Sequence, residues 1–450
     1  MAEKNARQIV VEILQEIDRE GAYANVALKK ALDEHEDLIS KDKNLITEIT
    51  NGTVKYKRRI DYVINQFAKI PINKMKPIIR HVLRMSVYQI LFLDKIPESA
   101  VCNEAVKIVK KRKMGNLSGV VNGILRNVVR GQETISYPDK TTHPEEYLGI
   151  MYSFPDWLIK FWLKEYSFEF VETLCQSLNR TPDVSIRTNT LLISKKDLKE
   201  SLEKDGIRSE VGRLANEALR VKGITSVATL AAFQKGYFTV QDESSMLVSY
   251  VLDPQKGEEI LDVCAAPGGK STHIAELMGN EGTIMSADVY EHKLEMIKES
   301  AIRMKHPIIH TILQDATKKN AAYTEKFDRV LIDAPCSGLG LLHKKSDIRW
   351  NKEYKDITEL VKIQKEILKT CSPYVKPGGI MVYSTCTISS AENSQMALWI
   401  TQNLDFELES IDSYIPASLR NEDSKEGMIQ IFPQDGDSDG FFISRFRKRG

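Results

Sequence analysis

The chain of 450 residues is long enough for roughly two to four domains, and its 42% hydrophobic and 28% charged residues are ordinary for a globular protein. It shows no basic start followed by an apolar run and no stretch of about 18 apolar residues, so we expect a cytoplasmic protein without a membrane partner. Its six cysteines form no C-x-x-C pair and its eight histidines show no ligand spacing, which predicts free thiols and no metal.

Charge is distributed unevenly along the chain, although the net charge is only +1. Residues 51–130 hold 17 lysines and arginines against 4 acidic residues, whereas residues 1–50 hold 7 against 11. A concentrated basic region beside an acidic remainder favours a polyanionic partner.

Residues 1–135 are predicted to form an all-helical domain. Apolar residues recur there at helical spacing, prolines separate the segments, and no alternating strand pattern competes. Phosphate contacts are predicted for the basic runs 55–59 and 110–113 together with Arg80, Arg84, Arg126 and Arg130. The alternative for either run alone is a solvated helix face.

A polar linker over residues 131–142 leads to a small α/β connecting domain, predicted over residues 143–240. It combines an aromatic helix around Trp157 and Trp162, a strand over 184–189 and a charged helix near 194–205. We interpret the aromatic side chains as core rather than as a platform for nucleic-acid bases.

Residues 241–450 are predicted to form a doubly wound α/β domain. Strand-like runs at 259–264, 283–288, 308–313, 328–333 and 379–385 alternate with helical segments at 271–278, 291–304 and 355–370. This alternation is typical of a Rossmann-like parallel sheet covered on both faces. A final strand is expected at 441–443.

The first strand of this domain leads into a predicted cofactor loop. Glycines let the backbone approach a ligand closely, and the helix that follows presents unpaired N–H groups to an anion. The loop residues are Cys264, Ala265, Ala266, Pro267, Gly268, Gly269 and Lys270.

Two carboxylates follow the next two strands. Asp288 is placed to accept hydrogen bonds from ribose hydroxyls, and Asp315 to meet the base of a nucleotide-type cofactor. Each carboxylate alone could equally be a cap or turn residue. A phosphate-binding P-loop is a competing interpretation, but it requires glycine where this chain has Cys264. The G-x-G-x-x-G pattern of dehydrogenases is absent.

Two cysteines lie where strands end in loops. Cys336 follows strand 328–333 and Cys386 follows strand 379–385, and both are flanked by small or polar residues and proline. In the usual doubly wound order these two strands are neighbours, so both thiols and Asp333 should converge facing the cofactor loop. A buried structural thiol is the alternative for any single cysteine, and it suits Cys102, Cys175 and Cys371.

This combination of groups suits methylation of cytosine. Carbon-5 of cytosine is a poor nucleophile until a thiolate adds at carbon-6, and Asp333 could stabilise charge at N3 as the adduct forms. The second thiol could assist elimination. Spacing alone does not rank the two cysteines.

The motifs Cys264–Lys270, Asp333–Gly338 and Ser384–Thr387 resemble those of the RNA cytosine carbon-5 methyltransferases, which use S-adenosylmethionine. The resemblance implies that Cys386 is the nucleophile, that Cys336 helps to release the product and that Asp333 contacts the cytosine. It also implies that the loop residues, Asp288, Asp315 and Asp333 line the cofactor. Gly440, Phe441 and Phe442 resemble the terminal strand of that family.

The helical segment resembles the NusB RNA-binding domain, through residues 21–25, 83–89, 103–106 and 121–126. A NusB-like domain joined to such a methyltransferase is the arrangement of the bacterial Fmu/Sun family, which implies 16S ribosomal RNA as the partner and not DNA. Another RNA such as tRNA, an RNA-remodelling ATPase and a non-catalytic ribosome assembly factor remain alternatives. We expect a monomer.

Overall fold

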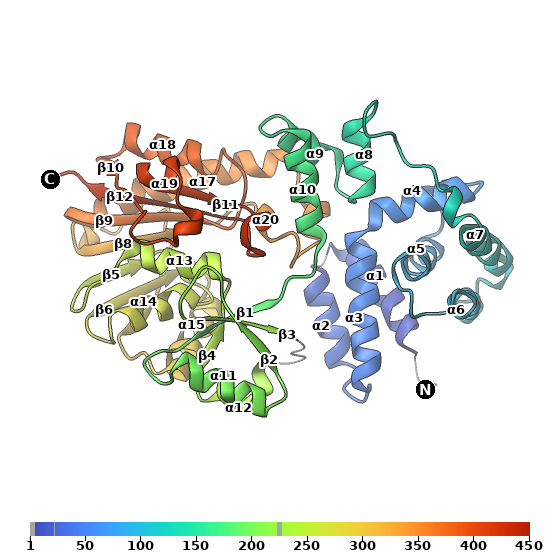
Figure 1. The fold of residues 1–450 in the computed structure, drawn as a ribbon, viewed down its shortest axis with the longest axis horizontal. Helices are drawn as coiled ribbons and strands as arrows, with labels where there is room; N and C mark the ends of the chain where they lie inside the picture. Colours follow the sequence, from blue (N-terminus) through green and yellow to red (C-terminus); the bar gives the residue numbers. More distant parts are fainter. Residues whose placement is uncertain (1–4, 22, 223–226) are drawn as a thin grey trace. The chain divides into compact units, whose positions relative to one another are not determined.

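The computed structural model describes residues 5–21, 23–222 and 227–450. Residues 1–4 and 22 of the predicted helical domain, and residues 223–226 of the predicted small α/β domain, lie outside the described residues. The chain forms two units (Figure 1): Met1–Arg180 with Leu342–Lys352, and Thr181–Leu341 with Glu353–Gly450. The three predicted domain boundaries remain predictions, since one unit can hold more than one domain.

The described elements of the first unit are helices, as the sequence predicts for residues 1–135. The central helix α5 is buried around its whole circumference and contacts α1, α3, α4, α6 and α7, so apolar side chains occur on all of its sides. The α-helices of this unit are α1 (Ala6–Glu20), α2 (Ala24–Asp33), α3 (Ser40–Lys55), α4 (Lys57–Phe67), α5 (Pro77–Phe92), α6 (Glu98–Lys111), α7 (Ser118–Arg130), α8 (Pro144–Met151), α9 (Asp156–Leu163), α10 (Phe168–Asn179) and α16 (Ile348–Asn351).

Segment 342–352 belongs to the first unit although it lies within the second in sequence. Arg349 is fully buried, donates to Ser153 O at 3.1 Å and to Asn179 Oδ1 at 3.0 Å, and stacks on the Phe154 ring at 3.9 Å. Trp350 donates its indole N–H to Val54 O at 2.7 Å. These contacts fasten the segment to the helical core.

The second unit begins with a small antiparallel sheet in the order β2-β3-β1-β4. The sequence predicts the first of these strands and the charged helix correctly. The elements are β1 (Val184–Thr188), β2 (Arg208–Val211), β3 (Ala218–Lys222), β4 (Phe238–Val240), α11 (Lys195–Lys204) and α12 (Ala231–Gln234). Strand β2 escapes prediction because it is an edge strand with almost no buried side chain.

The main sheet has the order β10-β12-β9-β8-β5-β6-β7. Its five parallel strands are β5 (Glu259–Asp262), β6 (Thr283–Asp288), β7 (Ile309–Leu313), β8 (Phe327–Asp333) and β9 (Val375–Thr385). The antiparallel strands are β10 (Phe406–Leu408), β12 (Phe441–Lys448) and β11 (Met428–Ile431), which pairs with β12. The doubly wound prediction is therefore confirmed, with an antiparallel edge added and a longer final strand.

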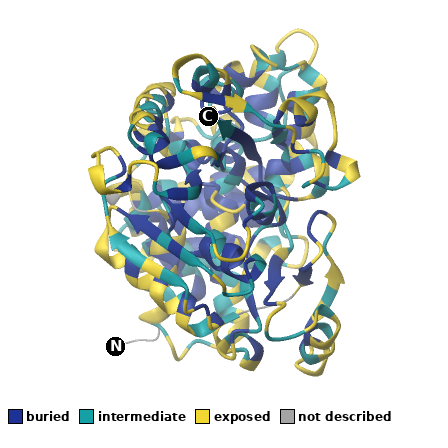
Figure 2. Ribbon diagram, turned by 90° about the vertical axis from the view of Figure 1, so that its left-hand side faces the viewer, coloured by how far each residue is buried: buried dark blue, intermediate teal, exposed yellow. Residues whose placement is uncertain are grey.

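Helices cover both faces of this sheet, and the strands are largely buried between them (Figure 2). Along β8, Val330 and Ile332 pack with α17 and α18, whereas Leu331 packs with α13 and α14 on the opposite face. The helices are α13 (Glu243–Leu252), α14 (Gly269–Leu277), α15 (Glu291–Met304), α17 (Tyr354–Cys371), α18 (Ser394–Asn403), α19 (Glu422–Glu426) and α20 (Pro433–Gly436). Among the described residues, no helix combines the length and apolarity needed to cross a membrane.

Candidate active site

The predicted cofactor loop connects β5 to the start of α14. Gly268 is the N-cap of α14 and has a φ of +100°, in the left-handed region that favours glycine. A side chain there would also bring its Cβ to 3.2 Å from Ile297 Cα. No side chain caps α14, so its first N–H groups and the positive end of its dipole face the loop.

Asp262, at the end of β5, is a further candidate site residue, absent from the sequence predictions. It is fully buried and accepts a hydrogen bond from Ser271 Oγ at 2.6 Å, while its Oδ1 has no partner among the described residues. Burial raises the pKa of Asp262 to about 7, against the opposing effect of the Ser271 hydrogen bond. Its position at a strand end directly before a glycine loop was the available signal.

Asp288 and Asp315 lie at the ends of the next two strands, as predicted, but differ in their contacts. Asp288 is buried and accepts from Tyr290 N at 3.2 Å, with Lys293 Nζ at 3.4 Å. Asp315 accepts from Thr317 N at 3.0 Å and Thr317 Oγ1 at 2.6 Å, which makes it a turn residue as well as a candidate ligand.

The two predicted thiols lie together. Strands β8 and β9 are parallel neighbours with Asp333 paired to Ser384, and the loops that follow place Cys336 Sγ 3.3 Å from Cys386 Sγ. Both cysteines are free and partly buried. The spatial premise drawn from the doubly wound order is therefore confirmed.

Asp333 connects the thiol loops to the cofactor loop. Lys270 Nζ donates to Asp333 Oδ2 at 2.7 Å, and Ser384 Oγ donates to Asp333 Oδ1 at 2.8 Å. Burial would lower the pKa of Lys270, but the charge and hydrogen bond of Asp333 raise it above its usual value. The pair therefore places a fixed positive charge and a hydrogen-bonded carboxylate at one sheet edge.

The terminal strand supports the same edge. Gly340 N donates to Cys386 O at 3.1 Å, and Gly440 N donates to Gly340 O at 3.0 Å. A Cβ on Gly340 would lie 1.9 Å from Gly440 O, so only glycine permits this close approach. The predicted motif at Gly440–Phe442 thus reaches the loop of Cys386.

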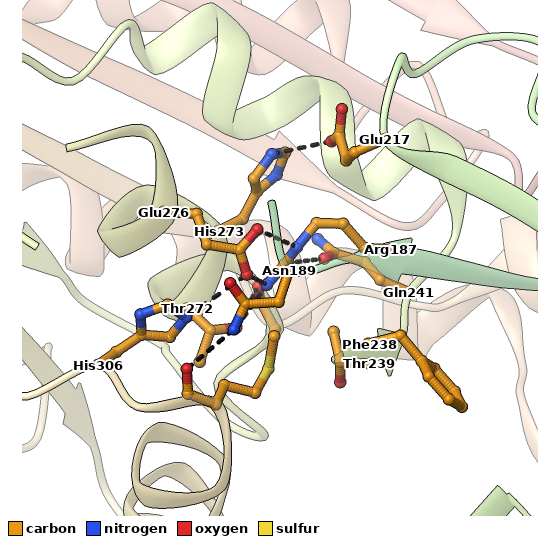
Figure 3. A network of polar contacts seen from close by, with 12 residues as sticks. Arg187, Asn189, Glu217, Phe238, Thr239, Gln241, Thr272, His273, Glu276 and His306 are labelled. Carbon is orange, nitrogen blue, oxygen red and sulfur yellow. Dashed lines mark hydrogen bonds and ion pairs between the residues drawn. The ribbon is translucent and has the colours of Figure 1, made fainter. Parts of the chain in front are cut away.

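A buried ion-pair network lies against α14 on the side of the small sheet (Figure 3). Arg187 of β1 is fully buried and donates to Gly269 O at 2.7 Å, Thr272 Oγ1 at 3.0 Å and Glu276 Oε1 at 2.8 Å. His306 Nε2 lies 3.4 Å from Glu276 Oε1. Burial opposes ionisation of Glu276, but Arg187 brings its pKa below the usual value. This network fixes the helix that the cofactor loop enters.

The residues described contain no cluster of three or more histidine, cysteine or acidic side chains that could hold a metal ion.

Comparisons with known proteins cover the chain from end to end. Residues 249–447 match the family model of the 16S rRNA methyltransferase RsmB/F, residues 4–130 match the NusB family, and residues 154–228 match the ferredoxin-like domain of RsmF/B-like methyltransferases. The fold is therefore a NusB-like helical domain, a ferredoxin-like small domain and a methyltransferase domain.

Three relatives illustrate the similarity. A probable ribosomal RNA small subunit methyltransferase B from Bacillus subtilis is 39% identical and covers 100% of both chains. Its counterpart from Synechocystis is 36% identical and covers 99% of both. The crystal structure of PH0851 is 28% identical, covers 99% of both chains and superposes with a TM-score of 0.81. The chain therefore belongs to the RsmB/F family of 16S rRNA methyltransferases.

Proposed function

We propose that this protein transfers a methyl group from S-adenosylmethionine to carbon-5 of a cytosine in 16S ribosomal RNA, through a covalent cysteine–cytosine intermediate. The observation that carries the proposal is the 3.3 Å separation of the two sulfur atoms at the ends of adjacent strands, beside Asp333. A cysteine that serves only to pack the core does not require a second thiol and a carboxylate beside it, whereas nucleophilic catalysis does use such neighbouring groups.

The cofactor is assigned to the loop between β5 and α14. The uncapped start of α14 suits the carboxylate of the cofactor, and Asp288 suits its ribose hydroxyls. Asp262 Oδ1 offers a buried acceptor that has no hydrogen-bond partner in the described part of the chain. Residues Cys264–Lys270 would line the rest of the cofactor site, and Asp315 and Asp333 would lie at the two ends of that site. When bound, S-adenosylmethionine supplies the methyl group.

The proposed reaction uses the two cysteines in different roles. Cys386 Sγ forms a bond to carbon-6, which moves an electron pair toward carbon-5, and carbon-5 accepts the methyl group. Methyl transfer leaves S-adenosylhomocysteine. Removal of the carbon-5 proton then re-forms the double bond between carbon-5 and carbon-6 and returns the electron pair of the sulfur–carbon bond to Cys386 Sγ. Cys386 Sγ takes a proton from the Cys336 thiol, and the Cys336 thiolate so formed accepts the carbon-5 proton. The hydrogen bond with Cys386, together with burial, raises the pKa of Cys336, which favours the protonated thiol and a role in release. Asp333 is assigned to the cytosine.

The RNA is assigned to the end of α6 and the adjoining α7. Lys110, Lys111 and Lys113 are exposed there, as are Arg126 and Arg130. The basic run 55–59 is a weaker candidate than the sequence indicated, because its side chains are used inside the first unit.

Two residues of that run illustrate its internal use. Arg58 donates to Phe154 O at 2.5 Å, while burial followed by the charge of Arg349 lowers the pKa of Lys55 to about 8. Arg84 likewise forms a bidentate pair with Asp61 at 2.7 Å. The exposed cluster at α6 and α7 is therefore the better phosphate surface.

The chemistry is tested with a 16S rRNA transcript, labelled S-adenosylmethionine and bisulfite sequencing. The wild type should leave 5-methylcytosine, and Cys386→Ala should reduce incorporation to background. Cys175→Ala, which alters a buried cysteine in α10, is the control and should retain activity. Methyl incorporation at a position other than carbon-5 of cytosine would refute the proposed chemistry, and methylation of tRNA alone would refute the substrate.

The RNA surface is tested by salt titration of binding. The triple variant K110Q/K111Q/K113Q should weaken affinity and reduce the slope of log K against log salt by about 0.7 to 0.9 for each phosphate that the protein no longer neutralises. The matched control K29Q/K30Q/K41Q alters three exposed lysines of α2 and α3 and should leave the slope unchanged. Equal slopes for the two triple variants would refute this surface.

A further inference from the structure

Glu392 lies in the loop between β9 and α18, six residues after Cys386, and none of its surface is exposed. It is not part of the loop motifs that carry the thiols. A fully buried carboxylate is costly unless its oxygens accept hydrogen bonds, so its contacts indicate what it does in the fold.

The contacts of Glu392 reach the loop of Cys336. Its Oε1 accepts from Ser337 N at 2.8 Å and from Gln364 Nε2 at 3.1 Å, and its Oε2 accepts from Ser337 Oγ at 2.6 Å. Gln364 also donates to Pro335 O at 3.0 Å. The residues on both sides of Cys336 are therefore held by this carboxylate or by its partner.

The same cluster reaches the loop of Cys386. Ser337 Oγ lies 2.7 Å from Thr387 Oγ1. The neighbour of Glu392 in sequence, Asn393, donates to Thr387 O at 2.9 Å and accepts from Thr385 Oγ1 at 2.5 Å. Thr385, which precedes Cys386, therefore binds Asn393. Thr387, which follows Cys386, binds Asn393 and Ser337, and Ser337 is itself bound to Glu392.

These donors to Glu392 are neutral, in contrast to an ordinary buried ion pair. Burial raises the pKa of Glu392, while the hydrogen bonds from Ser337 and Gln364 oppose the rise. Such a cluster stabilises less than apolar packing of equal volume would, but it fixes geometry, because each hydrogen bond has a preferred length and direction.

We propose that Glu392 is a positioning residue for methyl transfer, which holds the loops of Cys336 and Cys386 at the separation that lets both sulfur atoms act on one pyrimidine. The catalytic part of this inference, that Glu392 supports methyl transfer, rests on the proposed function. Its geometric content, the separation of two sulfur atoms, can be measured without substrate.

The test measures bridging of the two thiols by dibromobimane, in which each sulfur displaces one bromide. The bridged Cys336–Cys386 peptide pair is quantified by mass spectrometry at pH 8.5. Labelling of each cysteine by monobromobimane, in variants that lack the other, corrects for changes in thiol reactivity. Glu392→Ala and Glu392→Gln are compared with Glu243→Ala and Glu243→Gln. Glu243 is a matched control, since it is a buried carboxylate that accepts from Leu214 N at 2.6 Å and Ala215 N at 3.2 Å.

Corrected bridging should fall at least tenfold in Glu392→Ala, by an intermediate factor in Glu392→Gln, and by less than twofold in the Glu243 variants. The kcat of methyl transfer should fall by about 10²-fold in Glu392→Ala, the effect expected of a misplacement near 1 Å, with the KM for S-adenosylmethionine unchanged within threefold.

Bridging equal to wild type in a folded Glu392→Ala protein overturns the proposal, whatever happens to activity. If Glu392→Ala does not fold, Glu392→Gln decides, and wild-type bridging in that variant overturns it. A raised KM with unchanged kcat also overturns it. Reduced bridging in an enzyme whose wild type methylates no cytosine would support the positioning role while refuting the proposed function.

Discussion

Two buried polar regions of the second unit differ in how their charges are compensated. Behind α14, Arg187 faces Glu276 at 2.8 Å, so a buried positive charge meets a buried negative one. Near the carboxyl ends of the parallel strands, Asp262 at the end of β5 and Glu392 in the loop after β9 are buried carboxylates that accept hydrogen bonds from neutral donors. The first arrangement holds elements together, whereas the second costs stability and lies at the candidate site, where perturbed carboxylates are expected.

The largest effect should follow from breaking the compensated pair. Arg187→Met leaves Glu276 buried without its guanidinium partner, with His306 Nε2 still 3.4 Å from Glu276 Oε1, so the free energy of unfolding should fall by about 3 to 5 kcal/mol in denaturant titrations. The double variant Arg187→Met/Glu276→Gln should recover part of this loss, because no charge is then left without a partner. A loss below about 1 kcal/mol in the single variant would remove the distinction between the two regions.

A smaller, pH-dependent effect should follow at Asp262. Its folded pKa of about 7 lies above the ordinary value of 3.8, so the native state binds more protons than the unfolded state between these values. Stability should therefore fall as pH rises from about 4 to about 8, and Asp262→Asn should abolish this part of the fall.

Across that range, the free energy of unfolding of the wild type should fall by up to about 4 kcal/mol more than that of Asp262→Asn. The two pKa values of Asp262 differ by about 3 units, and each unit contributes about 1.4 kcal/mol. This difference is measured by thermal or denaturant unfolding of the cofactor-free protein at each pH. Parallel stability curves for the two proteins would contradict the burial of an ionisable Asp262.

The smallest effect should come from an exposed ion pair. Arg213 and Asp437 lie 2.8 Å apart, but 56% and 37% of their side chains are exposed. Arg213→Ala should change the free energy of unfolding by less than about 1 kcal/mol, because solvent already screens the pair. A loss comparable to that of Arg187→Met would show that burial does not set the ranking.

The sequence predicts the strand ends of this fold better than the contacts behind them. The sites of Cys336 and Cys386 followed from periodicity and from the neighbour rule for doubly wound sheets. The role of Glu392 was not predicted, because it depends on contacts with Ser337, 55 residues away in the sequence. Hydrophobic periodicity within a segment gives no information about such contacts. The role of Arg349 was not predicted for the same reason. The basic run 55–59 shows that a high density of positive charge in the sequence does not distinguish a binding surface from side chains that form contacts inside the protein.

The central claim assigns Cys386 as nucleophile and Cys336 to product release, and trapping of protein–RNA adducts tests it most directly. With S-adenosylmethionine and a 16S rRNA transcript, Cys336→Ala should accumulate a covalent complex that migrates slowly on denaturing gels, while Cys386→Ala should form none. Accumulation in Cys386→Ala alone would reverse the two roles, and the absence of an adduct in both variants would contradict covalent catalysis.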